Sequence, residues 1–202
     1  MALIQIFAKP PVEGKVKTRL IADIGEQKAT QVYRYCLRHT LGLVRESGYG
    51  YQIWLSEDTN DPLFNREPCH LQQGANLGSR MLQAIDSQLR ENTLADGKIV
   101  LTGSDCLDLT RIHLQQAFDA LSTHDIVLAP AYDGGYALIG CRTIDAQLFK
   151  DVKWGGAEVL KQTVNNAQSL GYQISMLETV RDIDTLADLS YYPELLALVD
   201  NY

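Results

Sequence analysis

The sequence predicts an α/β fold, with a mostly parallel central sheet flanked by helices and a mixed second half. Short apolar runs rich in β-branched residues alternate with segments whose apolar positions repeat every three or four residues. The connections between them are too long for hairpins, so right-handed crossovers and parallel strands are expected. The exception is DGG at 133–135, which separates two apolar runs and indicates a turn between antiparallel strands.

The elements follow in order from this alternation. The first strand, at 3–8, is expected to end at the sequence KPP, because two prolines cannot continue a ladder. The first helix is expected after Gly25 and should end near Gly48, and a polar loop should reach Gln73. Further strands are expected at 51–55, 98–102, 126–129, 136–141 and 173–177, and further helices at about 77–89, from 110, 157–170 and from 185.

Composition limits the function classes. The 202 residues, 46% of them hydrophobic, suffice for one domain with a sizeable core. A formal net charge of -7 argues against nucleic-acid and membrane partners. The apolar opening before Lys9 is too short for a signal peptide or a membrane span, so a cytoplasmic protein is expected. Four cysteines without a CxxC pattern predict neither disulfides nor a zinc site.

A basic loop follows the first strand. Lys9, Lys15, Lys17 and Arg19 place four cations within eleven residues of an acidic protein. The prolines and Gly14 are expected to keep this backbone non-helical, so that amides and cations can face one phosphate chain. The loop lacks the Walker pattern, and the chain has no GxGxxG. The alternative is a solvated loop that only improves solubility.

The loop after the strand at 98–102 carries two carboxylates. Asp105 lies in the loop that follows the strand, after Gly103 and Ser104, and its hard oxygens suit Mg²⁺ or Mn²⁺. Asp108 is interpreted as the cap of the next helix. A nucleophilic role for Ser104 is disfavoured, because the chain has no GxSxG motif.

A third loop, after the last strand, contains Asp182 and Asp184. Both carboxylates could reach one cation if the backbone is extended. Thr185 and Asp188 fit a capping box, which would account for Asp188 but not for Asp184.

Five motifs, taken in order, resemble one family. They are FAKPP.EGKVKTRL, GSDC..L, PAYDGGYALIG, F...VKWGG..VL..T and DIDT..DL, and they span nearly the whole chain. They resemble the small bacterial radical-SAM/selenodomain-associated transferases, type one, often called glycosyltransferases. These belong to the nucleotide-diphospho-sugar transferase superfamily, which has the Rossmann-like GT-A fold. The basic loop also resembles, more distantly, that of guanylyltransferases of the phospholactate and molybdenum-cofactor type.

The resemblance implies one domain, 1–202, with a nucleotide-binding half at 1–130 and an acceptor half at 131–202. It implies Mg²⁺ or Mn²⁺ at Asp105, with Asp184 as second ligand, although Asp182 could complete the site instead. The implied phosphate-binding residues are Lys17 and Arg19 first, then Lys9, Gly14, Lys15 and Ser104. The implied acceptor-side residues are Asp133, Gly134, Gly135 and Trp154.

The predicted function is metal-dependent transfer from a nucleotide-activated substrate, a nucleoside triphosphate or a sugar nucleotide, to a small-molecule acceptor. The catalytic candidates are Asp105, Lys17 and Arg19. Four cations suit an entire triphosphate and a departing pyrophosphate, which favours a nucleotidyltransferase. A glycosyltransferase using a nucleotide-diphospho-sugar is the first alternative, and a non-catalytic nucleotide-binding module the second.

Overall fold

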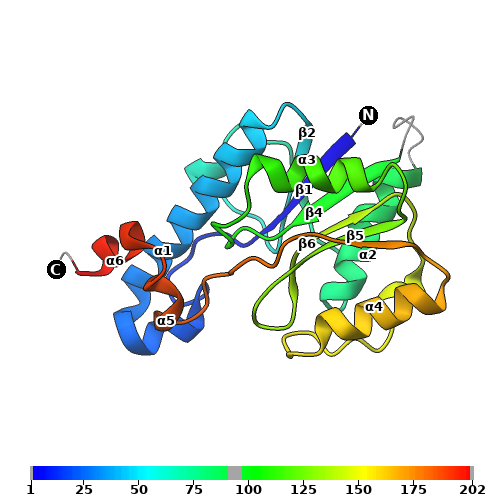
Figure 1. Cartoon of the computed structure of the whole chain (residues 1–202). Helices are drawn as coiled ribbons and strands as arrows, with labels where there is room; N and C mark the ends of the chain where they lie inside the picture. The colour runs from blue at the N-terminus through cyan, green and yellow to red at the C-terminus, as the bar shows by residue number, and fades with distance from the viewer. Residues whose placement is uncertain (1, 91–96, 201–202) are drawn as a thin grey trace.

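The computed structural model describes residues 2–90 and 97–200 and shows a mixed seven-stranded sheet between helices (Figure 1). The strand order is β3-β2-β1-β4-β6-β5-β7. The strands are β1 (Ala2–Ala8), β2 (Gly50–Leu55), β3 (Cys69–Leu71), β4 (Lys98–Thr102), β5 (Ile126–Pro130), β6 (Tyr136–Cys141) and β7 (Ile174–Met176). The α-helices are α1 (Thr18–Glu46), α2 (Leu77–Arg90), α3 (Arg111–Ala120), α4 (Val159–Ser169), α5 (Leu186–Leu189) and α6 (Pro193–Asp200), with 3-10 turns η1 (Pro62–Phe64) and η2 (Ala146–Phe149).

The predicted fold class is confirmed. Strand β1 pairs in parallel with β2 and β4, β2 pairs in parallel with β3, and β5 pairs in parallel with β7. Strand β6 is antiparallel to both of its neighbours, β4 and β5. The turn predicted at 133–135 therefore joins antiparallel strands, and the sheet is mixed in its second half, as expected.

Two hydrophobic layers enclose the sheet. On one face, apolar side chains of β1, β4 and β5 pack against the apolar stripes of α1 and α3. On the other face, side chains of β4, β5 and β6 pack against α2, α4 and η2. This arrangement follows from the near-continuous apolar strands, since strands buried on both faces need helices on both sides. None of the helices within the described ranges is long and apolar enough to cross a bilayer.

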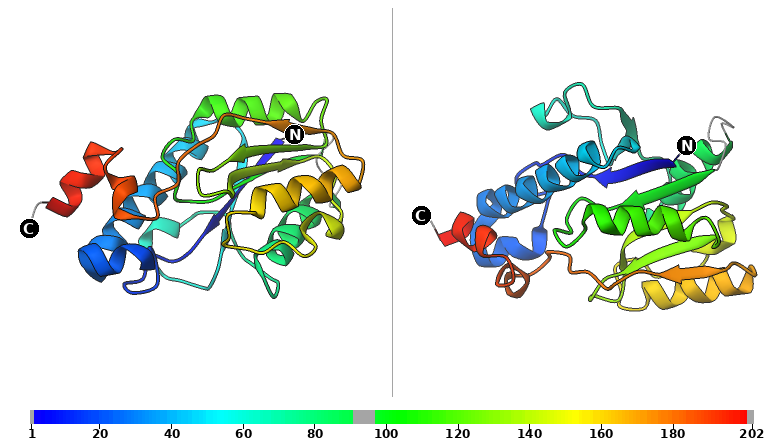
Figure 2. Two further views of the ribbon diagram at one scale, coloured as in Figure 1. Left: turned by 60° about the horizontal axis from the view of Figure 1, so that its bottom comes forward. Right: turned by 45° about the horizontal axis from the view of Figure 1, so that its top comes forward.

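The carboxyl-terminal segment forms a third packed region against α1. Ile183, Leu189 and Leu195 are fully buried together with Leu20 and Val32 of α1. Both views in Figure 2 show α5 and α6 beside α1, at the end of the molecule opposite α4. This packing fixes the chain between β7 and α5, which carries Asp182 and Asp184.

Two element predictions were incomplete. Helix α1 begins at Thr18 and passes through Gly25, whose φ of 78° and ψ of 164° interrupt the helical geometry. The helix predicted after Gly25 is therefore present, but a further helical segment at 18–24 precedes the kink and was not predicted. The region up to Gln73 was expected to be only a loop, but it contains η1 and the short edge strand β3. All three residues of β3 are exposed, so no apolar alternation marked it.

The turn at 133–135 is locked against the loop before α4. Gly134 has a φ of 89°, its carbonyl accepts a hydrogen bond from the Leu160 amide at 2.9 Å, and a methyl group on it would collide with the Ala157 carbonyl. Gly155 has a similar φ of 79° but open space around it.

We expect Gly134→Ala to destabilise the fold by at least about 3 kcal/mol, because strain and a backbone collision add. Gly155→Ala, the matched control, should cost only about 1 to 2 kcal/mol of backbone strain. Urea unfolding of both variants measures the difference. An equal loss of unfolding free energy in the two variants would mean that Gly134 does not pack tightly against Ala157.

Candidate active site

A polar cleft of about 430 Å³ lies where β1 and β4 end. The cleft is lined by the end of β1, the basic loop, the first turn of α1, the loop after β4, the start of α2 and one residue before α5. Its charged and polar lining residues are Lys9, Lys17, Thr18, Arg19, Tyr33, Ser56, Gln72, Arg80, Ser104, Asp105 and Asp184. The carboxyl ends of these strands thus hold chemically active side chains, as open α/β sheets usually do.

Lys17 makes two ion pairs within this cleft. Its Nζ lies 2.9 Å from Asp105 Oδ2 and 3.1 Å from Asp184 Oδ1, and its side chain is 4% exposed. Burial lowers the pKa of Lys17, but the charges of Asp105 and Asp184 outweigh that effect and hold its pKa above the ordinary value. The ammonium therefore stays charged and joins three loops that are distant in sequence.

The backbone of Lys17 is also unusual. The residue precedes α1 in the left-handed region, with a φ of 47° and a ψ of 44°. A non-glycine residue rarely adopts this conformation, which costs on the order of 1 kcal/mol or more. The two ion pairs of its ammonium hold the residue in this position.

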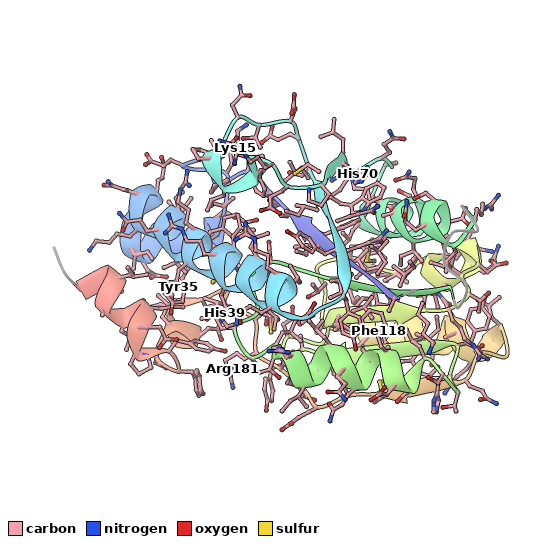
Figure 3. All side chains as sticks on the ribbon, turned by 90° about the horizontal axis from the view of Figure 1, so that it is seen from above. Lys15, Tyr35, His39, His70, Phe118 and Arg181 are labelled. Carbon is pink, nitrogen blue, oxygen red and sulfur yellow. The ribbon has the colours of Figure 1, made fainter. Side chains whose placement is uncertain are left out.

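The other three cations of the basic loop differ in their placement. Arg19 Nη1 lies 3.0 Å from Asp184 Oδ2, and exposed Lys9 lines the cleft. Lys15, labelled in Figure 3, is exposed, does not line the cleft, and pairs with Glu57 at 3.3 Å. Gly14 does not line the cleft either; its φ of 76° turns the loop.

Tyr33 of α1 connects two of the loops, and sequence reasoning missed it. Its hydroxyl donates to the Lys9 carbonyl at 3.0 Å, accepts from the Lys9 amide at 2.8 Å, and lies 3.0 Å from Ser104 Oγ. Burial raises the pKa of Tyr33 to about 12, so the hydroxyl stays protonated. Ser104 is buried in this contact, which gives it a structural role. Tyr33 lies on the apolar stripe of α1, so its polar contacts left no signal in the sequence.

Arg80 is a second residue that the sequence did not single out. It lies in α2 and lines the cleft, and its Nε donates to the Gly74 carbonyl at 3.1 Å. An arginine on an amphipathic helix usually lies on the solvated face, so only the packing of α2 reveals its position.

A second pocket of about 250 Å³ adjoins the cleft. Phe7, Leu77, Gly103 and Asp105 line both, so Asp105 lies at their junction. Of the predicted acceptor-side residues, Asp133, Gly135 and Trp154 line the second pocket, together with Asp182. Gly134 does not, because it packs against Ala157.

Asp182 and Asp184 point to different places. Asp184 shares Lys17 with Asp105, whereas Asp182 lines the second pocket. Burial raises the pKa of Asp182 to about 6, with smaller contributions from the charges of Asp133, Asp184 and Asp105.

The interpretation of Asp108 as a helix cap was wrong. Thr110 caps α3 in a capping box with His113. Asp108 instead accepts hydrogen bonds from the Arg181 amide at 2.8 Å and the Tyr192 hydroxyl at 2.7 Å, and so anchors the segment that follows β7. The capping box predicted for Thr185 and Asp188 is present at α5 and leaves the Asp184 side chain to Lys17 and Arg19.

The carboxylates at Lys17 fit a divalent cation. Oxygens of Asp105 and Asp184 already share one cation, the Lys17 ammonium, and hard oxygen donors suit Mg²⁺ or Mn²⁺. Mg²⁺ is commonly held by one or two carboxylates together with substrate phosphates. No group of three or more His, Cys, Asp or Glu that could hold a metal is present within residues 2–90 and 97–200.

The fold is that of nucleotide-sugar transferases and nucleotidyltransferases. The chain belongs to the family described as "Uncharacterized protein conserved in bacteria (DUF2064)", whose profile matches residues 43–156. A Desulfovibrio desulfuricans protein classed as a nucleotide-diphospho-sugar transferase is 29% identical, with a TM-score of 0.88 over 100% of this chain and 97% of that one. This match confirms the resemblance to the nucleotide-diphospho-sugar transferase superfamily that the motifs indicate.

More distant structures share the fold alone. The 4-diphosphocytidyl-2C-methyl-D-erythritol synthase of Anaerococcus prevotii is 9% identical, with a TM-score of 0.57 over 97% of this chain and 98% of that one. The inositol-1-phosphate CTP transferase of T. maritima is 14% identical, with a TM-score of 0.59 over 98% of this chain and 96% of that one. No curated protein sequence matches the chain.

Asp182→Asn should stabilise the metal-free protein at neutral pH. The folded-state pKa of about 6 exceeds the ordinary 3.8, so the folded wild type loses stability as pH rises from about 4 to 6. The variant lacks this loss and should be more stable at pH 7.5 by about 1 to 2 kcal/mol, after allowance for partial exposure. The difference should vanish near pH 4.

Urea unfolding in EDTA across this pH range measures the effect. Asp119→Asn, which neutralises an exposed carboxylate on α3, is the control and should leave the curve unchanged. A constant offset for Asp182→Asn at every pH would contradict the assigned pKa.

Proposed function

We propose that the protein is a metal-dependent transferase that binds the phosphate chain of a nucleotide-activated substrate in the polar cleft. One observation carries the proposal: Lys17 and Arg19 converge with Asp105 and Asp184 in a cleft that opens onto a second pocket. Departure of a phosphate requires two kinds of group. Cations bind the phosphate, and carboxylates bind a divalent cation.

Each of these residues has a role in this proposal. Lys9, Arg19 and Arg80 line the cleft and would contact phosphate oxygens, and Lys17 would keep the carboxylates and the phosphate chain in register. Asp105 and Asp184 would hold Mg²⁺ or Mn²⁺, which offsets negative charge on a departing phosphate. Because Asp105 also lines the second pocket, the reacting centre would lie at the junction.

The cations of the cleft do not favour nucleotidyl over glycosyl transfer. The preference for nucleotidyl transfer rested on four cations in one loop, but Lys15 lies outside the cleft, and Lys17 and Arg19 pair with carboxylates. Arg80 lines the cleft in place of Lys15, but no further cation among the described residues makes up for the pairing of Lys17 and Arg19. The cleft can therefore serve the diphosphate of a sugar nucleotide as well as a triphosphate.

A binding screen of nucleoside triphosphates and sugar nucleotides, with and without Mg²⁺, tests the proposal. We expect binding that strengthens with Mg²⁺ in at least one series. Absence of binding in both series would refute it. Product analysis then separates pyrophosphate release from nucleoside diphosphate release, and release of either would exclude a non-catalytic module.

Asp105→Asn should abolish the Mg²⁺-dependent stabilisation by a nucleotide. A ligand at about 100 times its dissociation constant stabilises a protein by about 2.7 kcal/mol, which thermal unfolding resolves. Asp184→Asn tests the second carboxylate, and Asp119→Asn on α3 is the control, expected to keep the full shift. An undiminished shift in Asp105→Asn would exclude Asp105 as the ligand.

Arg19→Ala should weaken nucleotide affinity by about 10- to 100-fold, because a charge-assisted contact to phosphate contributes roughly 1.5 to 3 kcal/mol. Lys15→Ala removes a cation from the same loop, yet it should have little effect, since Lys15 lies outside the cleft. Calorimetric titration at two salt concentrations measures both. Equal effects would indicate general attraction by the loop.

A further inference from the structure

The second pocket differs in charge from the cleft that it adjoins. Three carboxylates line it, those of Asp105, Asp133 and Asp182. Its lining, taken over the described part of the chain, includes no Lys, Arg or His, whereas the cleft has four cations. A site for a phosphate needs cationic or amide donors, and carboxylates repel it.

We infer that the second pocket takes an uncharged, hydroxyl-bearing group, such as an unphosphorylated sugar or polyol, and rejects its phosphate ester. The inference rests on the proposed function in one respect: the adjoining cleft holds the phosphate chain, so this pocket holds the transferred group or the acceptor.

Three cations directly precede pocket-lining residues in sequence, and none of them lines the pocket: Arg80, Lys153 and Arg181. Arg80 lines the cleft, and Lys153 is exposed. Arg181, which precedes Asp182, has its guanidinium 4.6 Å from the ring centre of Tyr132 and 3.8 Å from that of Tyr191. Figure 3 places Arg181 between the start of α3 and the carboxyl-terminal helices. It also pairs with Asp188 at 3.6 Å. Lys17 pairs with Asp105 and Asp184, and Arg19 pairs with Asp184. Of the three pocket carboxylates, only Asp105 thus has one of these cations as a partner, and Asp133 and Asp182 are not neutralised by them.

The remaining wall is apolar and aromatic, which suits the same ligand. Phe7, Tyr136 and Trp154 line the pocket with aliphatic side chains of α2 and β6. Trp154 is held edge-on by Phe149, with ring centres 5.9 Å apart, and α2 approaches it at Gly78, where a methyl group would collide with its ring. A rigid ring can pack against the C–H face of a sugar, while carboxylates accept hydrogen bonds from its hydroxyls.

The charge of the pocket bears on the reaction. Nucleotidyl transfer to a phosphorylated acceptor would bring a second phosphate among Asp133 and Asp182, even with Asp105 occupied by a cation. An uncharged group avoids this repulsion. The second pocket therefore favours transfer that involves an unphosphorylated sugar or polyol over transfer to a phosphate ester.

The two tryptophans of the chain, Trp54 and Trp154, allow a direct test. Trp54 lies in β2, is buried and stacks on His70, away from both pockets. In Trp54→Phe, the emission of Trp154 reports occupancy of the second pocket. Matched pairs serve as probes: glucose and glucose 1-phosphate, mannose and mannose 1-phosphate, inositol and inositol 1-phosphate, glycerol and glycerol 3-phosphate.

We expect at least one uncharged probe to shift Trp154 emission saturably, with at least tenfold tighter binding than its phosphate ester. Asp182→Asn in the same background should reduce the ratio of the two affinities, uncharged probe to phosphate ester, at least threefold. Asp119→Asn should leave this ratio unchanged. Tighter or equal binding of the phosphate esters, or no shift with any pair, would overturn the inference.

A second measurement covers the case in which Trp54→Phe does not fold. With the wild-type protein, a sugar nucleotide should compete with its own nucleoside diphosphate less well after Asp182→Asn, while the affinity for the diphosphate stays unchanged. An unchanged ratio would overturn the inference. Absence of nucleotide binding would instead overturn the proposed function, and the Trp154 titration would still decide the chemistry of the pocket.

Discussion

The arrangement of the site depends on one ammonium group. Lys17 lies between Asp105 and Asp184, carboxylates that are 88 and 167 residues further along the chain. Removing the ammonium would leave two carboxylates facing each other, and removing either carboxylate would leave a nearly buried cation with half its compensation. The loops after β1 and β4 and the segment before α5 are therefore interdependent. Tyr33 adds a second connection, because its hydroxyl joins Lys9 to Ser104.

The topology of the sheet explains why two different chemistries lie side by side. Parallel strands β1 and β4 end at the same edge and deliver the basic loop and Asp105 to one cleft. Antiparallel β6 lies next to β4, so the turn that precedes β6 brings Asp133 and Gly135 to that same edge. Asp105 lies between the two regions because it follows the strand they share. Among the described residues that line both the cationic cleft and the anionic pocket, Asp105 is the charged one.

The fold was largely predictable from the sequence, because every described strand except β3, and most helices, left an apolar pattern. Two local features were missed: the helical segment at 18–24 that precedes the kink at Gly25, and β3, which is exposed and has no apolar face. At the site, the residue types that would bind phosphate and metal were visible as loop motifs. Their pairing was not, because Lys17 and Asp184 meet only through the packing of α5 and α6 on α1. Likewise, Lys15 and Lys17 look equivalent in sequence, yet the backbone turn at Lys17 sends only one of them into the cleft.

The placement of Asp184 has a consequence for how the site forms during synthesis on the ribosome. The loop that carries Lys17 is made early, and Asp105 can join it once β4 has been translated. The ion pairs of Asp184 with Lys17 and Arg19 cannot form until residue 184 has been added and has left the exit tunnel. A nascent chain therefore has most of its sheet before it has an assembled cleft. Nucleotides can gain a complete binding site only after the segment that follows β7 has left the tunnel, which delays ligand binding until the fold is nearly finished.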